Sequence, residues 1–174
     1  MSEDRADYHT DSPVLSAVDF LNLAEERLVC RVDLAEIGRK GIVFVRELTA
    51  DEKAAVLPRP KGKARMHKDQ SIEIDWSQLS PDAAVKFLEK CLVSIDKDPA
   101  LFFGANGSSR ETAVIPADQL TPVYDEFVRH LGRPHLAREK LGDTPNAVMD
   151  LLVKKIREIS GLDNDEDDDR EKKD

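Results

Sequence analysis

The chain has 174 residues and a formal charge of −9, with 40% hydrophobic and 35% charged residues. This length suits one domain with a single core. The negative charge argues against binding of the whole chain to DNA or to a membrane, because both present negative surfaces. The first 25 residues lack the long apolar run of a signal peptide, and no apolar stretch approaches the roughly 20 residues needed to span a bilayer. We therefore expect a soluble, cytosolic protein.

The first predicted elements lead into a β-hairpin. Residues 1–15 are polar and charged, and we expect them to be disordered. Residues 16–25 carry enough apolar side chains for a short helix. From Leu28, apolar and other residues alternate with the period of two that is typical of a strand. Gly38 and Gly41 bracket the turn that follows.

A second strand and a helix come directly after this turn. Residues 42–48 are rich in β-branched side chains. Thr49 and Glu52, three residues apart, form a capping box that opens a helix over residues 51–56. Because most of the later chain has helical periodicity, we expect this hairpin to be the main sheet on which the helices pack.

The segment 58–70 interrupts the pattern with two prolines and a glycine, which exclude a regular element. Its basic side chains are Arg59, Lys61, Lys63, Arg65 and Lys68. We expect a flexible basic loop that is either a solvated connection or a binding site for anions or a partner. A nucleic-acid site would have aromatic residues among the charges for stacking, and this loop has none.

The second half of the chain predicts three main helices. Residues 71–76 alternate well and predict a third, edge strand. A serine cap and a proline then open a helix whose apolar stripe runs through residues 80–95. A similar start and stripe predict a helix over residues 121–131, and the last helix covers residues 143–161. A short turn of helix over residues 135–141 lies between these two.

The connection over residues 96–115 contains a cluster of apolar side chains, Leu101, Phe102 and Phe103. These residues either pack into the core or form a patch that faces a partner. The residues alone leave both interpretations open.

The sequence contains no recognisable catalytic or metal-binding constellation. Cys30 and Cys91 occupy apolar positions and are expected to be buried. His130 and His135 are five residues apart, which is not the spacing that places two metal ligands on one helical face. The acidic residues of segment 162–174 lack the glycine of a calcium loop. We expect no enzymatic activity, no metal and no cofactor.

The predicted fold is therefore α+β, a single domain over residues 16–161. An antiparallel β-hairpin or small three-stranded sheet packs against mostly helical structure, and the charged termini are disordered. Residues 162–174 form an acidic tail with a net charge of −5, from eight acidic and three basic residues. Because the loop 58–70 is basic, the opposite charges of the two segments allow either self-association or an autoinhibitory contact within one chain.

The order of these elements resembles that of the tail assembly chaperones of long-tailed phages. The resemblance covers residues 16–162 as a profile of element order and spacing, and no single motif in it is specific. The segments that carry it are Val45-Arg46-Glu47-Leu48-Thr49 with Asp51-Glu52, the helix ending in Cys91-Leu92-Val93-Ser94-Ile95-Asp96, the pair Leu101-Phe102, and the end of the last helix, Ile159-Ser160-Gly161-Leu162.

The resemblance implies a function without catalysis. Such chaperones act in the host cytoplasm, bind the tape measure protein, keep its long apolar helices soluble, and help to recruit the major tail tube protein. They are absent from the mature virion. An apolar groove between helices would receive an amphipathic client helix, with Leu101, Phe102 and Phe103 as part of that surface.

The family also implies a programmed frameshift that adds a C-terminal domain, and this chain would be the short form. Glu171-Lys172-Lys173 can be encoded by a run of adenines that contains a slippery heptamer. The codons of the gene decide whether slippage occurs here.

Two other functions remain open at this stage. The chain could be a small regulator that binds nucleic acid through residues 59–68, although its net charge of −9 makes this partner unfavourable. It could also be a structural tail component that stays in the particle.

Overall fold

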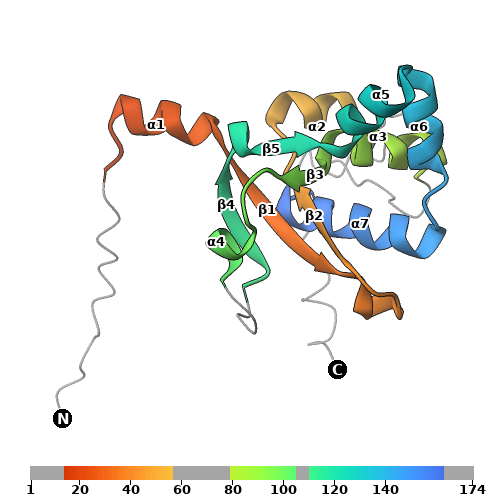
Figure 1. The fold of residues 1–174 in the computed structure, drawn as a ribbon. Coiled ribbons are helices and arrows are strands. Elements are labelled where there is room, and N and C mark those ends of the chain that lie inside the picture. Colours follow the sequence, from red (N-terminus) through yellow and green to blue (C-terminus); the bar gives the residue numbers. More distant parts are fainter. Residues whose placement is uncertain (1–13, 57–78, 105–109, 163–174) are drawn as a thin grey trace, which may run out of the picture.

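The computed structural model describes residues 14–56, 79–104 and 110–162 of the chain (Figure 1). The fold is α+β, as the sequence predicts. The elements are α1 (Ala17–Ala24), β1 (Glu26–Asp33), η1 (Leu34–Ile37), β2 (Ile42–Arg46), α2 (Ala50–Val56), α3 (Pro81–Cys91), β3 (Leu92–Ile95), α4 (Ala100–Phe103), β4 (Thr112–Pro116), η3 (Ala117–Gln119), β5 (Leu120–Pro122), α5 (Val123–Leu131), α6 (Pro134–Gly142) and α7 (Asn146–Ile159). The expected basic loop, the expected strand at 71–76 and residues 1–13 and 163–174 of the terminal tails lie outside the described residues.

The predicted hairpin is confirmed, but the predicted extent of the sheet is wrong. β1 and β2 pair antiparallel, with Cys30 opposite Val45. Three further strands extend this hairpin into a five-stranded antiparallel sheet with the order β4-β1-β2-β3-β5. β3 was expected to be the end of the preceding helix. It follows Cys91 directly, and its apolar residues prolong the stripe of α3.

The sheet curls because a short connection joins its two outermost strands. β4 and β5 lie at opposite ends of the strand order, yet only Ala117–Gln119 separates them. Five flat strands would place these edges about 19 Å apart at the usual spacing of ~4.8 Å. The four residue steps from Pro116 to Leu120 span at most about 14 Å. The sheet therefore bends, and β5 begins beside the end of β4 (Figure 1).

The main core lies between one face of this sheet and the helices α2, α3, α6 and α7, and Tyr124 and Phe127 of α5 pack against it. β1 contributes Cys30 and Val32 to it, and β2 contributes Val45. The largest buried side chains from the helices are Phe87, Leu88, Leu141, Leu152 and Ile156. In Figure 1 these helices lie on the same side of the strands, whereas α4 lies on the other side.

A smaller core fills the opposite, concave face. Its buried members are Val29 of β1, Ile115 of β4 and Phe103 of α4. Partly buried side chains from β2, β3 and β5 pack against them, so all five strands contribute to this cluster; these side chains include Phe44, Ile95 and Leu120. One turn of helix, α4, thus covers the inside of the curled sheet.

A dense set of hydrogen bonds holds the junction between β2 and α2. The carboxylate of Glu52 accepts from both terminal nitrogens of Arg46, at 2.8 and 2.7 Å, and from the Thr49 N–H at 2.9 Å. The Glu52 N–H donates to Thr49 Oγ1 at 3.3 Å, which confirms the capping box. Burial alone would raise the pKa of Glu52, but the hydrogen bonds from Arg46 and Thr49 outweigh it and lower this pKa to about 2.

The same junction is tied to the end of the last helix. The Leu48 N–H donates to Oγ of Ser160 at 2.9 Å, across 112 positions of the chain. Ser160 is the buried polar residue among those described, with 3% of its surface exposed. The neighbouring Glu47 Oε1 accepts from the Leu28 N–H at 2.9 Å and so closes the start of β1. The segment from Arg46 to Thr49 therefore links the sheet, α2 and the end of α7.

We expect Glu52→Gln to lower the free energy of unfolding at pH 7 by about 1–2 kcal/mol, because it removes a charged, bidentate partner of Arg46. A carboxylate with a lowered pKa stabilises the fold fully above its unfolded pKa near 4.5 and loses this effect as the pH falls towards about 2. Urea denaturation from pH 7 to pH 2 should thus show a shallower decline in the variant.

Glu158→Gln is the matched control for that variant. It removes only long, exposed contacts to Lys154 and Lys155, at 4.0 and 3.9 Å. Such contacts contribute little, so its stability should stay within about 0.5 kcal/mol of the parent. Equal losses in both variants would contradict a special role for Glu52.

Ser160→Ala should destabilise the protein by about 1–3 kcal/mol, because it leaves the buried Leu48 N–H without an acceptor. Ser160→Thr keeps the hydroxyl and should recover part of this loss. Thermal denaturation of the three proteins measures the difference. A Ser160→Ala protein as stable as the parent would show that water replaces the hydroxyl.

Candidate partner-binding surfaces

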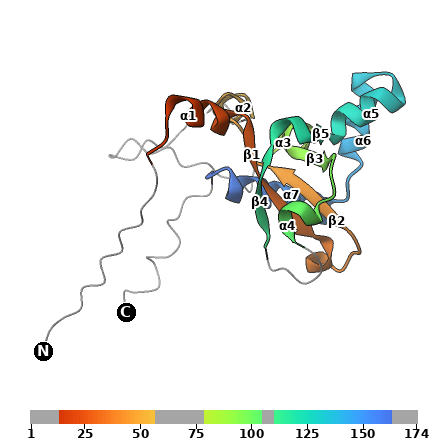
Figure 2. The same cartoon turned by 60° about the vertical axis from the view of Figure 1, so that its left-hand side comes forward.

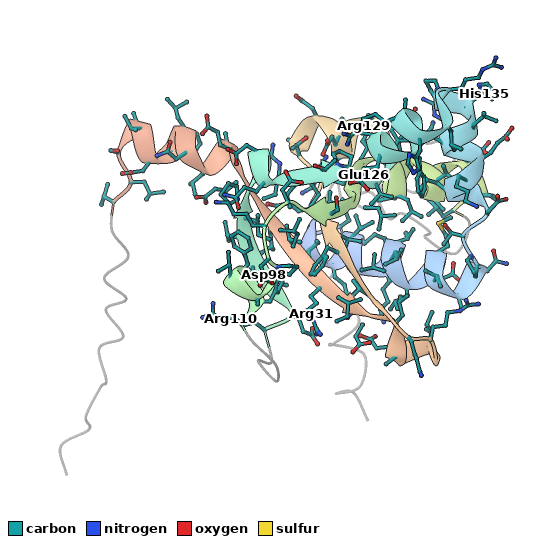
Figure 3. All side chains as sticks on the ribbon, viewed as in Figure 1. Arg31, Asp98, Arg110, Glu126, Arg129 and His135 are labelled. Atoms are coloured by element: carbon teal, nitrogen blue, oxygen red, sulfur yellow. The ribbon has the colours of Figure 1, made fainter. Side chains whose placement is uncertain are left out.

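The predicted cluster at residues 101–103 forms α4, a single helical turn. Asp98 Oδ1 accepts from the Ala100 N–H at 3.0 Å and fixes the start of the turn. Gly104, with a φ of 84°, ends it, in a conformation that other residues rarely adopt. Figure 3 shows the side chains of Asp98 and Arg31 in this part of the molecule.

The three apolar residues of α4 have different environments. Phe103 is buried, with 4% exposed, and its ring centroid lies 5.4 Å from that of Phe44. Phe102 is half-buried against the same cluster. Leu101 is 71% exposed. The core interpretation therefore holds for Phe103, and Leu101 is exposed; whether Leu101 contacts a partner stays a prediction.

A cavity of about 500 Å³ lies beside α4. Arg31 of β1 and Phe44 of β2 line it together with Asp98 and Phe103. Ile42, 46% exposed, adds an apolar edge. Among the described residues Arg31 makes no ion pair, so this cavity combines an apolar wall with an unpaired cation.

A larger groove of about 930 Å³ lies between α2, α3, α6 and α7, on the other side of the sheet. Its apolar lining comes from Ala55, Val56, Leu79, Pro81, Ala84, Val85 and Met149. Charged side chains of both signs also line it, namely Asp82, Lys86, Glu89, Lys90, Arg138, Glu139 and Asp150. An apolar surface bordered by mixed charges is suited to an amphipathic helix.

Two walls of this groove are linked by a charged contact. Arg138 of α6 donates from Nε to Glu89 of α3 at 3.2 Å. The same guanidinium lies 5.9 Å from the centre of the Tyr124 ring, in a cation–π contact. These contacts join α6 to α3 and to Tyr124 of α5 at the surface of the groove.

The groove and α4 do not form one surface. The sequence interpretation placed Leu101, Phe102 and Phe103 within a groove between helices, but α4 lies on the concave face of the sheet and the helices cover the other face. In Figure 2, turned by 60°, α4 lies beside β4 and β2, whereas α5 and α6 lie at the upper right. The other predicted site residues, Arg59, Lys61, Lys63 and Arg65, lie outside the described residues.

Sequence reasoning did not find the residues of the groove. Ala55 and Met149 come from helices that are distant in the chain, and no local pattern predicts that α2, α3, α6 and α7 surround one space. The only local signal is the charge beside the apolar stripe of α3, for example Lys86 and Glu89. That pattern is also typical of any solvated helix face.

Side chains of metal-ligating and nucleophilic types also occur within the described residues. Within residues 14–56, 79–104 and 110–162, no three His, Cys, Asp or Glu side chains gather in a way that could hold a metal ion. Both cysteines are buried, as expected. Burial raises the pKa of Cys30, and it raises the pKa of Cys91 to about 12, so neither is a reactive thiolate at neutral pH.

Comparisons with protein families, characterised proteins and solved structures find no match to this chain. In the part of the chain that the structure describes, no helix has the length and apolar character required to cross a membrane.

We expect Phe103→Ala to destabilise the protein by about 3–5 kcal/mol, since it empties the centre of the concave cluster. Leu101→Ala, two residues away, should change the stability by less than about 0.5 kcal/mol because Leu101 is mostly exposed. Chemical denaturation of both variants tests this division. Similar losses for the two would mean that α4 does not pack as described.

Proposed function

We propose that this chain is a non-catalytic tail assembly chaperone of a long-tailed phage. It binds the tape measure protein and the major tail tube protein during tail morphogenesis, in the host cytoplasm, and leaves before the virion is complete. The groove of about 930 Å³ between α2, α3, α6 and α7 carries the proposal, because its apolar lining bordered by charges suits an amphipathic client helix.

The chemistry of the groove supports a helical client. The apolar side chains Val56, Val85 and Met149 can take up the apolar face of a helix, while the charged residues meet its polar edges. The charges include both signs, so recognition depends on their pattern and not on net attraction. An apolar contact of this kind persists at raised salt, unlike a contact with phosphates.

The segments that resemble this family also support the proposal, because they meet in space. Leu48 of the Arg-Glu-Leu-Thr segment donates its N–H to Ser160 of the Ile-Ser-Gly-Leu segment. Arg46 and Thr49 both hold Glu52. These segments join β2, α2 and the end of α7, and α2 and α7 form two walls of the groove.

The function is tested by co-expression with the long helical protein encoded directly downstream. The chaperone proposal expects that this partner is soluble only in the presence of the chain and that both co-elute at raised salt. An insoluble partner, or the absence of such a gene, would overturn the proposal. Mass spectrometry of purified virions distinguishes a chaperone, absent from particles, from a structural tail protein.

Ala55→Glu should reduce the recovery of the client about tenfold, because it places a charged side chain in the groove. Ala54→Glu is the matched control: both alanines are exposed on α2, but only Ala55 lines the groove. Pull-down at equal expression gives the ratio, and circular dichroism checks that both variants fold. If the two variants recover the same amount of client, the groove is not the binding site.

A further inference from the structure

The first helix of the described chain presents its apolar residues to solvent. α1 contains no buried residue. Val18, Phe20, Leu21 and Leu23 are 65%, 69%, 66% and 48% exposed. In Figure 1 this helix extends away from the rest of the molecule at the start of β1. Apolar residues are normally buried by the fold that carries them, so this arrangement requires an explanation.

Local contacts define the position of α1 despite its exposure. Ser16 and Asp19 form a complete capping box at its start. At its end, Arg27 donates from Nη1 to the carbonyl oxygens of Ala24 and Glu26, both at 2.7 Å. Only Glu25 separates the helix from β1. These contacts define the direction in which this short arm leaves β1.

An arm of this length needs a second surface to be stable. Isolated helices shorter than about 12–15 residues are marginal in water, and α1 has 8 residues. At roughly 100° per residue, its apolar side chains cover about 220° of its circumference, from Leu23 through Phe20 to Val18. Only Asp19 and Asn22 occupy the remaining polar strip. Such a helix fits between two surfaces and not on a single flat one.

A further exposed apolar residue, on β4, lies near the point where α1 joins β1. Val114 of β4 is 57% exposed and pairs with Leu28, on the sheet face away from α4. Two residues later Pro116 pairs with Glu26, where the arm joins β1. The arm leaves the sheet beside the end of β4 (Figure 1), and both elements carry exposed apolar side chains.

We propose that this arm is a dimerisation element, and that its partner is the arm and β4 of a second copy of the chain. In a two-fold arrangement each α1 lies between the partner's α1 and the partner's β4. The broad apolar circumference of α1 then has two surfaces to contact. The polar strip of Asp19 and Asn22 faces solvent, so the Asp19 carboxylates of the two copies do not face each other.

The exposed area is consistent with a stable dimer. Seven apolar side chains contribute, namely Val14, Leu15, Val18, Phe20, Leu21, Leu23 and Val114. At roughly 100 Å² for a fully exposed side chain of this size, they offer about 450 Å² of apolar surface. Because protein interfaces are about 60% apolar, an interface that buries all of this apolar surface would cover a total area of roughly 750 Å² per copy. Stable complexes bury about 800 Å² per partner.

The test is the mass of the purified full-length chain, by sedimentation velocity and light scattering from about 1 to 100 μM, without a client. We expect a dimer for the parent. The double variant Phe20→Glu/Leu21→Glu should raise the dissociation constant at least 100-fold and sediment as a monomer. Glutamate favours helices, and both positions are exposed, so the domain stays folded.

Leu101→Glu is the matched control, because Leu101 is equally exposed but lies on α4. This variant should remain a dimer. A monomeric parent at 100 μM would overturn the proposal, and so would a dimer that persists in the double variant. If the parent is monomeric alone but the double variant fails to bind the downstream client, α1 contacts the client and the dimer proposal is wrong.

A covalent test uses Leu21→Cys. Cys30 and Cys91 are buried, so the introduced thiol is the accessible one among the described residues. Mild oxidation should yield a disulfide-linked dimer at protein concentrations where Leu101→Cys yields none. Equal cross-linking of the two variants would contradict a defined contact between the arms.

Discussion

The hydrogen bonds of one carboxylate organise the centre of this fold. Glu52 accepts hydrogen bonds from Arg46 at the end of β2 and from Thr49 at the start of α2. One side chain therefore fixes both the end of the strand and the start of the helix. Leu48 lies between them, with its side chain buried and its N–H bonded to α7. Sheet, second helix and last helix thus meet within four residues. A change at this junction affects the geometry of every surface that the helices form.

The second constraint is the curl of the sheet, which creates two different faces. The three-residue connection between β4 and β5 forces the strands to bend around α4. The outer face is then free to carry four helices, and the spaces between these helices form the groove. The side chain of Phe103 is buried on the concave face, whereas Leu101, on the same helical turn, remains exposed to solvent. The curl of the sheet therefore accounts for both candidate surfaces, the groove between the helices and the exposed Leu101 on α4.

The elements with local signals could be predicted from the sequence. Capping residues marked the starts of α2 and α3, and Ser160 stood at the predicted end of the last helix. β3 could not be separated from α3, because Leu92–Ile95 continues the apolar stripe without a glycine or a proline. Pro122 suggested a helix start, whereas β5 extends to it and α5 begins at Val123.

The candidate sites were predictable only in part, because exposure and enclosure depend on tertiary packing. The apolar character of residues 101–103 was evident, but their division between core and surface depends on the curl of the sheet. The groove combines residues from both halves of the chain, and α1 has the composition of a packed helix although its own domain does not cover it. Periodicity identifies an apolar face, but it does not identify what lies against that face.

The bond between Leu48 and Ser160 also sets an order of events during synthesis. A ribosome adds about 5–20 residues per second, so the 112 positions between the two partners take roughly 6–22 s to translate. During this interval the hairpin and α2 exist without α7, and the Leu48 N–H has no native acceptor. The contact between the β2–α2 junction and the end of α7 can therefore form only after residue 160 has been added. A nascent chain that stalls before residue 146 lacks α7, and with it the wall of the groove that Asn146, Met149 and Asp150 provide.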